Sequence, residues 1–321
     1  MTDLFAGGEM DVGTPSSGSV YEVTTSGAFD SASARCGIYI STSSSYWECA
    51  TFTGSSDVFF HWRSYLYATY GATPTPLLTV YAGATPVARL QSVFISVPAS
   101  YTITAEYYSG GVWTAAGASS FTLTCLQLQT LDMRVNVAGG AIEVYSSGTK
   151  LINVSGLTLA GSITMGRWSG PFTAQQVISE VVAATTSTVG VSVKTRYPSG
   201  AGNSSSWTGT YADVDEIVYS DADGLSSAAS NQVSLFTHSG ATLTGLTVRG
   251  VCVASRGKKG ATGPTGVQSA LRISAVNYFT ATMNLTTGYL AYPGIWTVSP
   301  ATAVAFTATE VTNAEFGLKS I

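Results

Sequence analysis

The stretch "DMRVNVAGGAIEVYSSGTKLINVSG", residues 132–156, decides the fold class of this chain. Apolar and polar residues alternate along three short runs, so each run has one apolar and one polar face, as a β-strand does. Gly139–Gly140 and Ser147–Gly148 separate the runs, and two-residue turns of this composition close β-hairpins. The stretch therefore predicts three antiparallel strands in succession.

The same pattern extends through most of the 321 residues, as in "ARCGIYIS", "DVFFHWRSYLYATYG" and "SYTITAEYYSGGVWTAAG". β-Branched and aromatic residues favour a pleated, half-buried surface, and the 34 glycines mark turns. Helix-favouring Leu, Glu, Lys and Arg are sparse. Many short strands at this spacing predict an all-β chain that folds as an antiparallel β-sandwich or jelly roll.

A glycine-rich segment, "GKKGATGPTG", predicts where this sandwich ends. Gly257, Gly260, Gly263 and Gly266 follow the Gly-X-Y register of collagen. We expect the sandwich over residues 1–255, a linker over 256–266 and a small C-terminal β extension over 267–321, whose last strand is a candidate for return to the sandwich. The linker is either a surface loop or the place where three copies meet. Because the chain is also poor in charge, we expect a homo-oligomer, with a trimer favoured.

The charge balance excludes some classes of partner. The formal net charge is −4 and the pI is about 5.1, whereas a nucleic-acid-binding surface needs clustered Lys and Arg. No stretch approaches the roughly 18 apolar residues of a membrane span. The N-terminal "MTDLFAGGEMDVG" has neither the basic region nor the apolar run of a signal peptide. We therefore expect no nucleic-acid partner, no membrane insertion and no secretion signal.

The densest group of acids is "DVDEIVYSDADG", residues 213–224. Glycoside hydrolysis would need two carboxylates across one bond, and alternate residues of one strand could supply them at Asp213 and Asp215. However, glucanases with this type of sandwich carry E-x-D-x-x-E on one strand, and here Asp213 replaces the first Glu and Val218 the third acid. We therefore predict no glycosidase activity.

The end of that group offers a second interpretation, which is a calcium site. Asp221 and Asp223 stand at alternate positions before Gly224, as in the first part of many oxygen-ligand loops. Without a following bidentate Glu, the same letters also form an ordinary solvated turn. We expect the turn, with Ca²⁺ at Asp221 and Asp223 as the alternative and no other cofactor.

The remaining reactive residue types form no catalytic pattern. His61, in "FFHWRSY", has no nucleophile elbow beside it and is expected in the core or at its rim. Cys36, Cys49, Cys125 and Cys252 do not have the spacing of a metal site, so we expect free buried thiols, with a Cys36–Cys49 bridge as the alternative. No catalytic residue is assigned, and the chain is predicted not to be an enzyme.

Several blocks of sequence together resemble one known family. The most distinctive are "SEVVAATTSTVG" and "WTGTYADVDE", and "FAGGEMD", "LDMRVNVAGGAIEVY" and the closing "IWTVSPATAVAFTATEVTNAEFGLKSI" add to them. They resemble the concanavalin-A-like structural proteins of tailed bacteriophages and prophages. The resemblance implies a concanavalin-A/laminin-G-like jelly roll, in which "VDEIVYS" is a sandwich strand and "DADG" its exit turn.

The same resemblance implies a non-enzymatic virion component, such as an accessory tail, collar or head-surface decoration protein. It would be assembled in the bacterial host cytoplasm and would bind other virion proteins. The alternative is a carbohydrate-binding adhesin on the virion that recognises a host glycan. Trp113, Trp168 and Trp207 lie near glycines and are the candidates for stacking on sugar rings. Alternatively, these tryptophans fill the core or a subunit interface.

Overall fold

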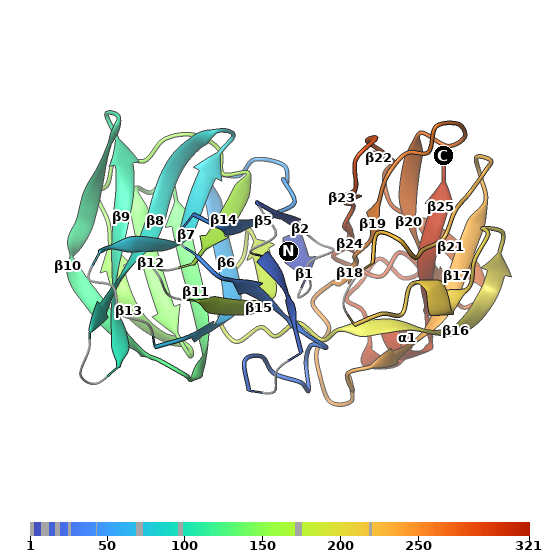
Figure 1. The fold of residues 1–321 in the computed structure, drawn as a ribbon, viewed down its shortest axis with the longest axis horizontal. Helices are drawn as coiled ribbons and strands as arrows, with labels where there is room; N and C mark the ends of the chain where they lie inside the picture. The colour runs from blue at the N-terminus through green and yellow to red at the C-terminus, as the bar shows by residue number, and fades with distance from the viewer. Residues whose placement is uncertain are drawn as a thin grey trace. The chain divides into compact units, whose positions relative to one another are not determined.

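The computed structural model of the chain describes residues 3–7, 13–16, 20–24, 27–42, 44–68, 73–95, 99–170, 175–217 and 220–321. The chain divides into two compact units, Met1–Val193 and Lys194–Ile321. Strands dominate both units (Figure 1). The predicted all-β fold class is therefore confirmed.

Unit 1 is a sandwich of two antiparallel sheets. The first, the eight-stranded sheet, runs in the order β13 (Thr149–Val154), β12 (Ala141–Ser146), β11 (Leu128–Asn136), β6 (Asp57–Leu66), β15 (Gln176–Ala184), β4 (Gly37–Ile40) and β3 (Val20–Val23), and β1 (Asp3–Gly7) also pairs with β15. The second, the seven-stranded sheet, runs β10 (Val112–Thr124), β9 (Ser100–Ser109), β8 (Thr85–Ile95), β7 (Thr75–Ala82), β14 (Met165–Ser169), β5 (Tyr46–Cys49) and β2 (Gly13–Pro15). This is the predicted jelly-roll type of sandwich.

Residues 132–156 form the hairpins that their sequence predicts. Strands β11, β12 and β13 pair in succession at one edge of the eight-stranded sheet. Gly140 and Gly148 in the two turns have φ of +58° and +85°, which a side chain would disfavour. Turn chemistry and alternation therefore act together in this part of the chain.

The core of unit 1 is an aromatic cluster between the two sheets. Trp168, on β14 of the seven-stranded sheet, lies 6.1 Å from both Phe60 and Trp62, on β6 of the other sheet, measured between ring centroids. Its ring is also 5.5 Å from that of Trp47 on β5. All four side chains are 0% exposed. The two sheets therefore meet through Trp168.

The cysteines follow the same burial. Each of the four keeps its thiol; Cys36, Cys49 and Cys125 are buried, and Cys252 is half-buried. Burial raises the pKa of the Cys49 thiol to about 12, although the Gly166 N–H donates a hydrogen bond to its sulfur at 3.3 Å. The expectation of buried thiols therefore holds for Cys36, Cys49 and Cys125 but not for Cys252, and the alternative Cys36–Cys49 bridge is not formed.

Unit 2 is built on a six-stranded sheet of its own. Its order is β16 (Arg196–Ser205), β17 (Val233–Gly240), β25 (Glu315–Ser320), β20 (Gly266–Ile273) and β21 (Val276–Phe279), and β22 (Met283–Asn284) pairs with β20. Two small ladders join β18 (Val251–Val253) to β24 (Gly294–Trp296) and β19 (Arg256–Gly257) to β23 (Leu290–Ala291). The short helix α1 (Ala308–Asn313) follows Thr307, whose hydroxyl accepts from the Glu310 N–H.

The division between the units differs from the expected sandwich boundary at residue 255. Strand β17 pairs with β16 on one side and with the last strand, β25, on the other. Residues 194–255 therefore share a sheet with the C-terminal part of the chain, and the last strand pairs within unit 2. The glycine-rich segment therefore does not mark the domain boundary. Local composition shows where the chain turns, but it does not show which distant strands pair.

The glycine-rich segment does not have a collagen backbone. Gly257 pairs in β19 and Gly266 in β20, and the Lys259 N–H donates to the Thr286 carbonyl at 2.6 Å. Gly263 has a φ of +98°, whereas a collagen chain needs a φ of about −75° at each residue. The segment is thus hydrogen-bonded within its own chain. The expectation that Gly257, Gly260, Gly263 and Gly266 line a three-fold axis in a collagen conformation is therefore wrong. A trimer remains a prediction without this support.

The acidic segment also departs from its expected structure. "VDEIVYS" was expected as a sandwich strand, but one turn of 3-10 helix, η2 (Tyr211–Asp213), precedes it and residues 214–217 are not in a strand. The Thr210 backbone N–H and hydroxyl both donate to the Asp213 carboxylate, which holds this turn. Val218 and Tyr219 lie outside the described residues. The prediction of a turn at 221–224 is correct.

Replacing Trp168 by Ala should lower the free energy of unfolding of unit 1 by about 3–5 kcal/mol, the usual cost of removing a buried aromatic side chain. Guanidinium chloride unfolding followed by far-UV circular dichroism measures it. Trp113→Ala, which removes a half-buried indole from the surface of the same unit, is the control and should cost much less. Equal midpoints for Trp168→Ala and the wild type would contradict the central position of Trp168.

His238, on β17 of unit 2, gives a pH-dependent prediction. Its ring packs edge-on against Phe316 with centroids 5.2 Å apart, and its Nδ1 lies 2.9 Å from the Phe236 carbonyl oxygen. Burial lowers the pKa of His238 from 6.5 to about 4; the Phe236 carbonyl opposes the shift and the Arg196 charge adds to it. Between pH 6.5 and 4 the unfolded chain therefore binds a proton that the folded chain does not.

The stability that neutral His238 contributes should be complete above pH 6.5 and should be lost as the pH falls toward about 4. Urea unfolding of the wild type and of His238→Phe across this range tests it. The free energy of unfolding of the wild type should fall more steeply with decreasing pH than that of the variant. Parallel curves would show that His238 titrates normally.

Candidate functional site

Five residues form a straight row across the outer face of the seven-stranded sheet. Cross-strand register places Glu48 of β5 opposite Arg167 of β14, Arg167 opposite Thr79 of β7, Thr79 opposite Arg89 of β8, and Arg89 opposite Glu106 of β9. We call these five residues the charged row. Four strand spacings of about 4.8 Å make the row about 19 Å long.

The charged row faces outward because the adjacent register row faces the core. The residues directly next to these five in the sequence, on one side of the row, pair in the same order and are all buried. They are Trp47, Trp168, Leu78, Leu90 and Ala105. Successive side chains of a strand point to opposite faces, so burial of one row sets the direction of the other.

At one end of the row, Arg167 is held between two tyrosines. Its guanidinium carbon lies 4.0 Å from the ring centroid of Tyr46 and 4.7 Å from that of Tyr81. Its Nε donates to Glu48 Oε1 at 2.6 Å, and its NH1 donates to the Tyr81 hydroxyl at 3.0 Å. Burial raises the pKa of Tyr81, and the Arg167 charge partly opposes this shift. The tyrosine therefore stays a neutral partner of the arginine.

At the other end, Arg89 lies on a tryptophan. Its guanidinium carbon is 4.0 Å from the ring centroid of Trp113, and Tyr108 meets that indole edge-on at 5.2 Å. Its Nε donates to Glu106 Oε2 at 2.6 Å. In the amide orientation that satisfies both polar atoms of Gln91, the Gln91 oxygen accepts from Arg89 NH2 at 2.7 Å.

The four charged side chains of the row are partly exposed. The side chains of Glu48, Arg167, Arg89 and Glu106 are 20%, 29%, 18% and 23% exposed, and the neighbouring aromatic rings are half-buried. Cation–π contact and ion pairing fix the guanidinium groups before any ligand arrives. The surface thus combines pre-oriented polar groups with aromatic rings.

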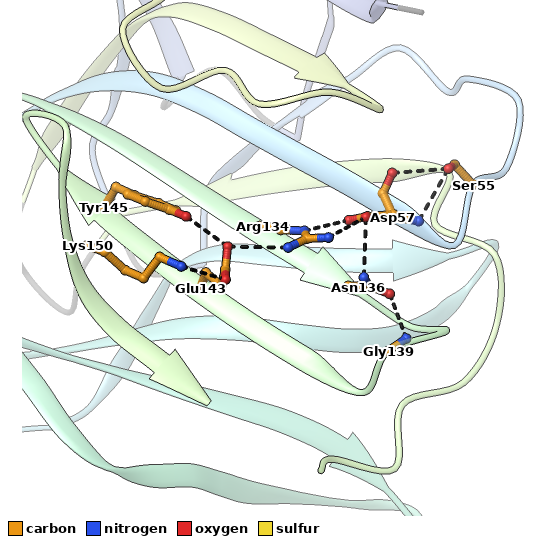
Figure 2. A network of polar contacts seen from close by, with 8 residues as sticks. All are labelled: Ser55, Asp57, Arg134, Asn136, Gly139, Glu143, Tyr145 and Lys150. Atoms are coloured by element: carbon orange, nitrogen blue, oxygen red, sulfur yellow. Dashed lines mark hydrogen bonds and ion pairs between the residues drawn. The ribbon is translucent and has the colours of Figure 1, made fainter. Parts of the chain in front are cut away.

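The outer face of the eight-stranded sheet carries a second polar network, shown in Figure 2. Arg134 on β11 donates to both carboxylate oxygens of Asp57 on β6, at 2.9 and 2.7 Å. Lys150 and Tyr145 both donate to Glu143, at 2.7 and 2.8 Å. Burial alone would raise the pKa of Glu143, but these two hydrogen bonds and the positive charges of Lys150 and Arg134 together lower it. The network therefore consists of ions that neutralise one another.

Further along the same face, charged side chains are fully covered. His61 Nδ1 lies 2.8 Å from Asp132 Oδ1, and Thr188, in the segment 185–193 that follows β15, donates to the same oxygen at 2.7 Å. Glu180, at a bulge in β15 with φ of +54°, pairs with Arg63 at 3.0 Å. Burial raises the pKa of Glu180, and Arg63 opposes the shift. His61, Asp132 and Glu180 are 0% exposed, so a ligand cannot reach them in this conformation.

The three candidate tryptophans have three different positions. Trp113 lies at the charged row, as the sugar-stacking hypothesis requires. Trp168 is buried at the centre of the core, so its assignment as a sugar-stacking residue is wrong. Trp207 belongs to unit 2, is half-buried, and donates from its indole nitrogen to the Gln232 carbonyl at 3.1 Å. The structure therefore brings only Trp113 of the three to the row.

The calcium alternative at Asp221 and Asp223 finds no support in the geometry. Both carboxylate oxygens of Asp221 accept hydrogen bonds from Arg256, at 2.7 and 2.9 Å, so a cation would have to displace a guanidinium. Within the described ranges, no three His, Cys, Asp or Glu side chains are grouped so that they could hold a metal ion. Arg256 instead joins the turn at 221–224 to the glycine-rich segment.

Sequence reasoning missed the other members of the row. Arg167 directly precedes the buried Trp168, and Glu48 directly follows the buried Trp47, so alternation along each strand could have shown that they face outward. Their alignment on one line depends on which strands are neighbours and in which register. Residues 48 and 167 are too far apart in the sequence for local patterns to show this pairing.

Comparisons with known proteins place the chain in no family. No family model matches the sequence, and no curated protein matches it. Among solved structures, "Cellulose induced protein, Cip1" matches with a TM-score of 0.41 and 14% identity over 56% of this chain and 93% of the other. Domain 4 of AbnA, an extracellular arabinanase of Geobacillus stearothermophilus, gives 0.39 and 10% over 57% and 93%. The carbohydrate-binding module CBM66 of Bacillus subtilis gives 0.35 and 10% over 54% and 94%.

These likenesses are too weak to argue from, and the fold class rests on the sheets themselves. No helix of the described residues is long and apolar enough to cross a membrane.

Proposed function

We propose that this chain is a non-enzymatic carbohydrate-binding protein, and that the charged row is its glycan-binding surface. The observation that carries the proposal is the register of the row, in which two guanidinium–carboxylate pairs lie on one line and aromatic rings from neighbouring positions pack against both guanidinium groups. Sugar rings have apolar C–H faces and a rim of hydroxyl groups. Aromatic rings bind the faces, and Arg and Glu supply donors and acceptors for the hydroxyls. A row about 19 Å long accommodates several sugar rings.

The absence of enzymatic activity is part of the proposal. Glycosidases need two carboxyl groups about 5–9.5 Å apart. The carboxylates of the row, Glu48 and Glu106, lie at opposite ends of about 19 Å, and each is held by an arginine. A bound glycan would therefore be retained and not cleaved.

The virion location is proposed on the sequence resemblance alone. On that basis the chain is an accessory tail, collar or head-surface protein that assembles in the bacterial host cytoplasm. It would bind other virion proteins. The homo-oligomer, with a trimer favoured, is proposed instead from the low charge of the chain. A glycan-binding surface in this position would take a host glycan as its partner.

Isothermal titration calorimetry against a panel of bacterial capsular and lipopolysaccharide glycans, neutral and acidic, tests the proposal. Trp113→Ala should weaken binding by at least about tenfold, or about 1.4 kcal/mol, because it removes both a stacking surface and the support of Arg89. Trp207→Ala, which removes a half-buried indole of unit 2, is the matched control and should leave the affinity unchanged.

Two outcomes would contradict the proposed function. One is a wild-type protein that binds no glycan of the panel. The other is an equal loss of affinity in Trp113→Ala and Trp207→Ala, since only Trp113 lies at the charged row. New reducing ends or unsaturated sugars in the incubated glycans would contradict the absence of enzymatic activity.

A further inference from the structure

The charges of the row are arranged symmetrically about its centre. From β5 to β9 the order is negative, positive, neutral, positive and negative, at Glu48, Arg167, Thr79, Arg89 and Glu106. Thr79 lies on the outer face but is only 5% exposed. The centre of the row is therefore a neutral floor with a guanidinium group on each side.

Both guanidinium groups keep donors for a ligand. Arginine has five N–H groups. Arg167 uses two toward Glu48 and one toward Tyr81, which leaves two. Arg89 uses two toward Glu106 and one toward Gln91, and its NH1 has no partner among the described residues. Each arginine can therefore donate to one further acceptor.

The arginines of the row are on the two strands beside Thr79, and the glutamates are one strand further away. By strand spacing, the backbone positions of the two arginines lie about 5 Å to either side of Thr79 and those of the two glutamates about 10 Å. Each guanidinium group is hydrogen-bonded to its glutamate, so an acceptor over Thr79 would be held by the N–H groups that these pairs leave unused, and not by net charge. The row is neutral as a whole, and its unused donors belong to the two arginines beside its centre.

We infer that the charged row selects glycans that contain an acidic sugar, and that the sugar carboxylate lies over Thr79 between Arg89 and Arg167. The inference rests on the proposed function and names the class of ligand for that surface. A carboxylate accepts paired N–H bonds from guanidinium groups in a fixed geometry. The sugars on either side would lie toward Trp113 at one end and toward Tyr46 and Tyr81 at the other.

The first test compares each acidic glycan of the panel with its carboxyl-reduced form, in which the acidic sugar becomes neutral and the rest of the polymer is unchanged. Calorimetry should show at least about tenfold tighter binding of the native form. The difference should shrink as salt is added, because ions screen charges at a solvent-exposed surface.

The second test uses charge-balanced variants. Arg89→Gln with Glu106→Gln removes one pair without changing the net charge, and it should abolish most of the preference for the native form. Arg134→Gln with Asp57→Asn removes a comparable pair on the other sheet and should leave the preference unchanged.

The third test separates recognition from a merely structural role of the pair. Glu106→Gln alone keeps the guanidinium group but removes a nearby negative charge, so it should strengthen binding of the native acidic glycan several-fold. If the pair only supported the fold, this substitution would weaken binding or leave it unchanged, and the inference would be wrong.

The outcomes separate this inference from the proposed function. If Trp113 is needed for binding but native and carboxyl-reduced glycans bind equally, the inference is overturned and the glycan-binding proposal stands. A preference for phosphorylated over carboxylated glycans also overturns it. If no glycan binds the wild type, both are overturned.

Discussion

The contact of Trp168 with the opposite sheet is the constraint on which unit 1 depends. Its indole reaches Phe60 and Trp62 on β6 and fixes how β14 lies against the other sheet. Neighbouring Gly166 leaves no room for a side chain, since a Cβ there would lie 2.9 Å from the rings of both Phe60 and Trp168. With Trp168 inside, the pleat of the strand turns Arg167 outward. The core thereby determines which residues form the surface row.

The two outer faces of the sandwich use their charges differently. On the eight-stranded sheet, His61 and Asp132 are buried, and the Thr188 hydroxyl donates to the Asp132 carboxylate. Other charged side chains of this face form the network of Figure 2. On the seven-stranded sheet, both guanidinium groups of the charged row lie 4.0 Å from an aromatic centroid and keep unused N–H groups, whereas Arg134 of the other sheet lies 5.3 Å from the Phe59 centroid. Pre-oriented, incompletely used donors beside aromatic surface are typical of a recognition site. This contrast makes the seven-stranded sheet the better candidate for binding.

Sequence reasoning predicted the fold class and the hairpins of residues 132–156, because alternation and turn chemistry are local properties. It placed the sandwich boundary at 255 on the basis of a local glycine pattern. That placement is wrong, because such a pattern carries no information on the pairing of β17 with β25. By one criterion, nearby glycines, it chose both Trp113, which lies half-buried at the charged row, and Trp168, which is buried in the core. The burial of an indole depends on the strand register and the opposing sheet, which a single sequence does not show.

The central claim is that a glycan binds at the charged row, and the indole N–H signals of the six tryptophans test it most directly. In two-dimensional NMR, titration with an acidic glycan from the panel should shift the Trp113 signal most, with saturation at the calorimetric stoichiometry. The signals of Trp47, Trp62 and Trp168, buried behind the row, should move little, and those of Trp207 and Trp296 in unit 2 should not move. Saturable shifts at Trp207 or Trp296 with an unchanged Trp113 would contradict the account.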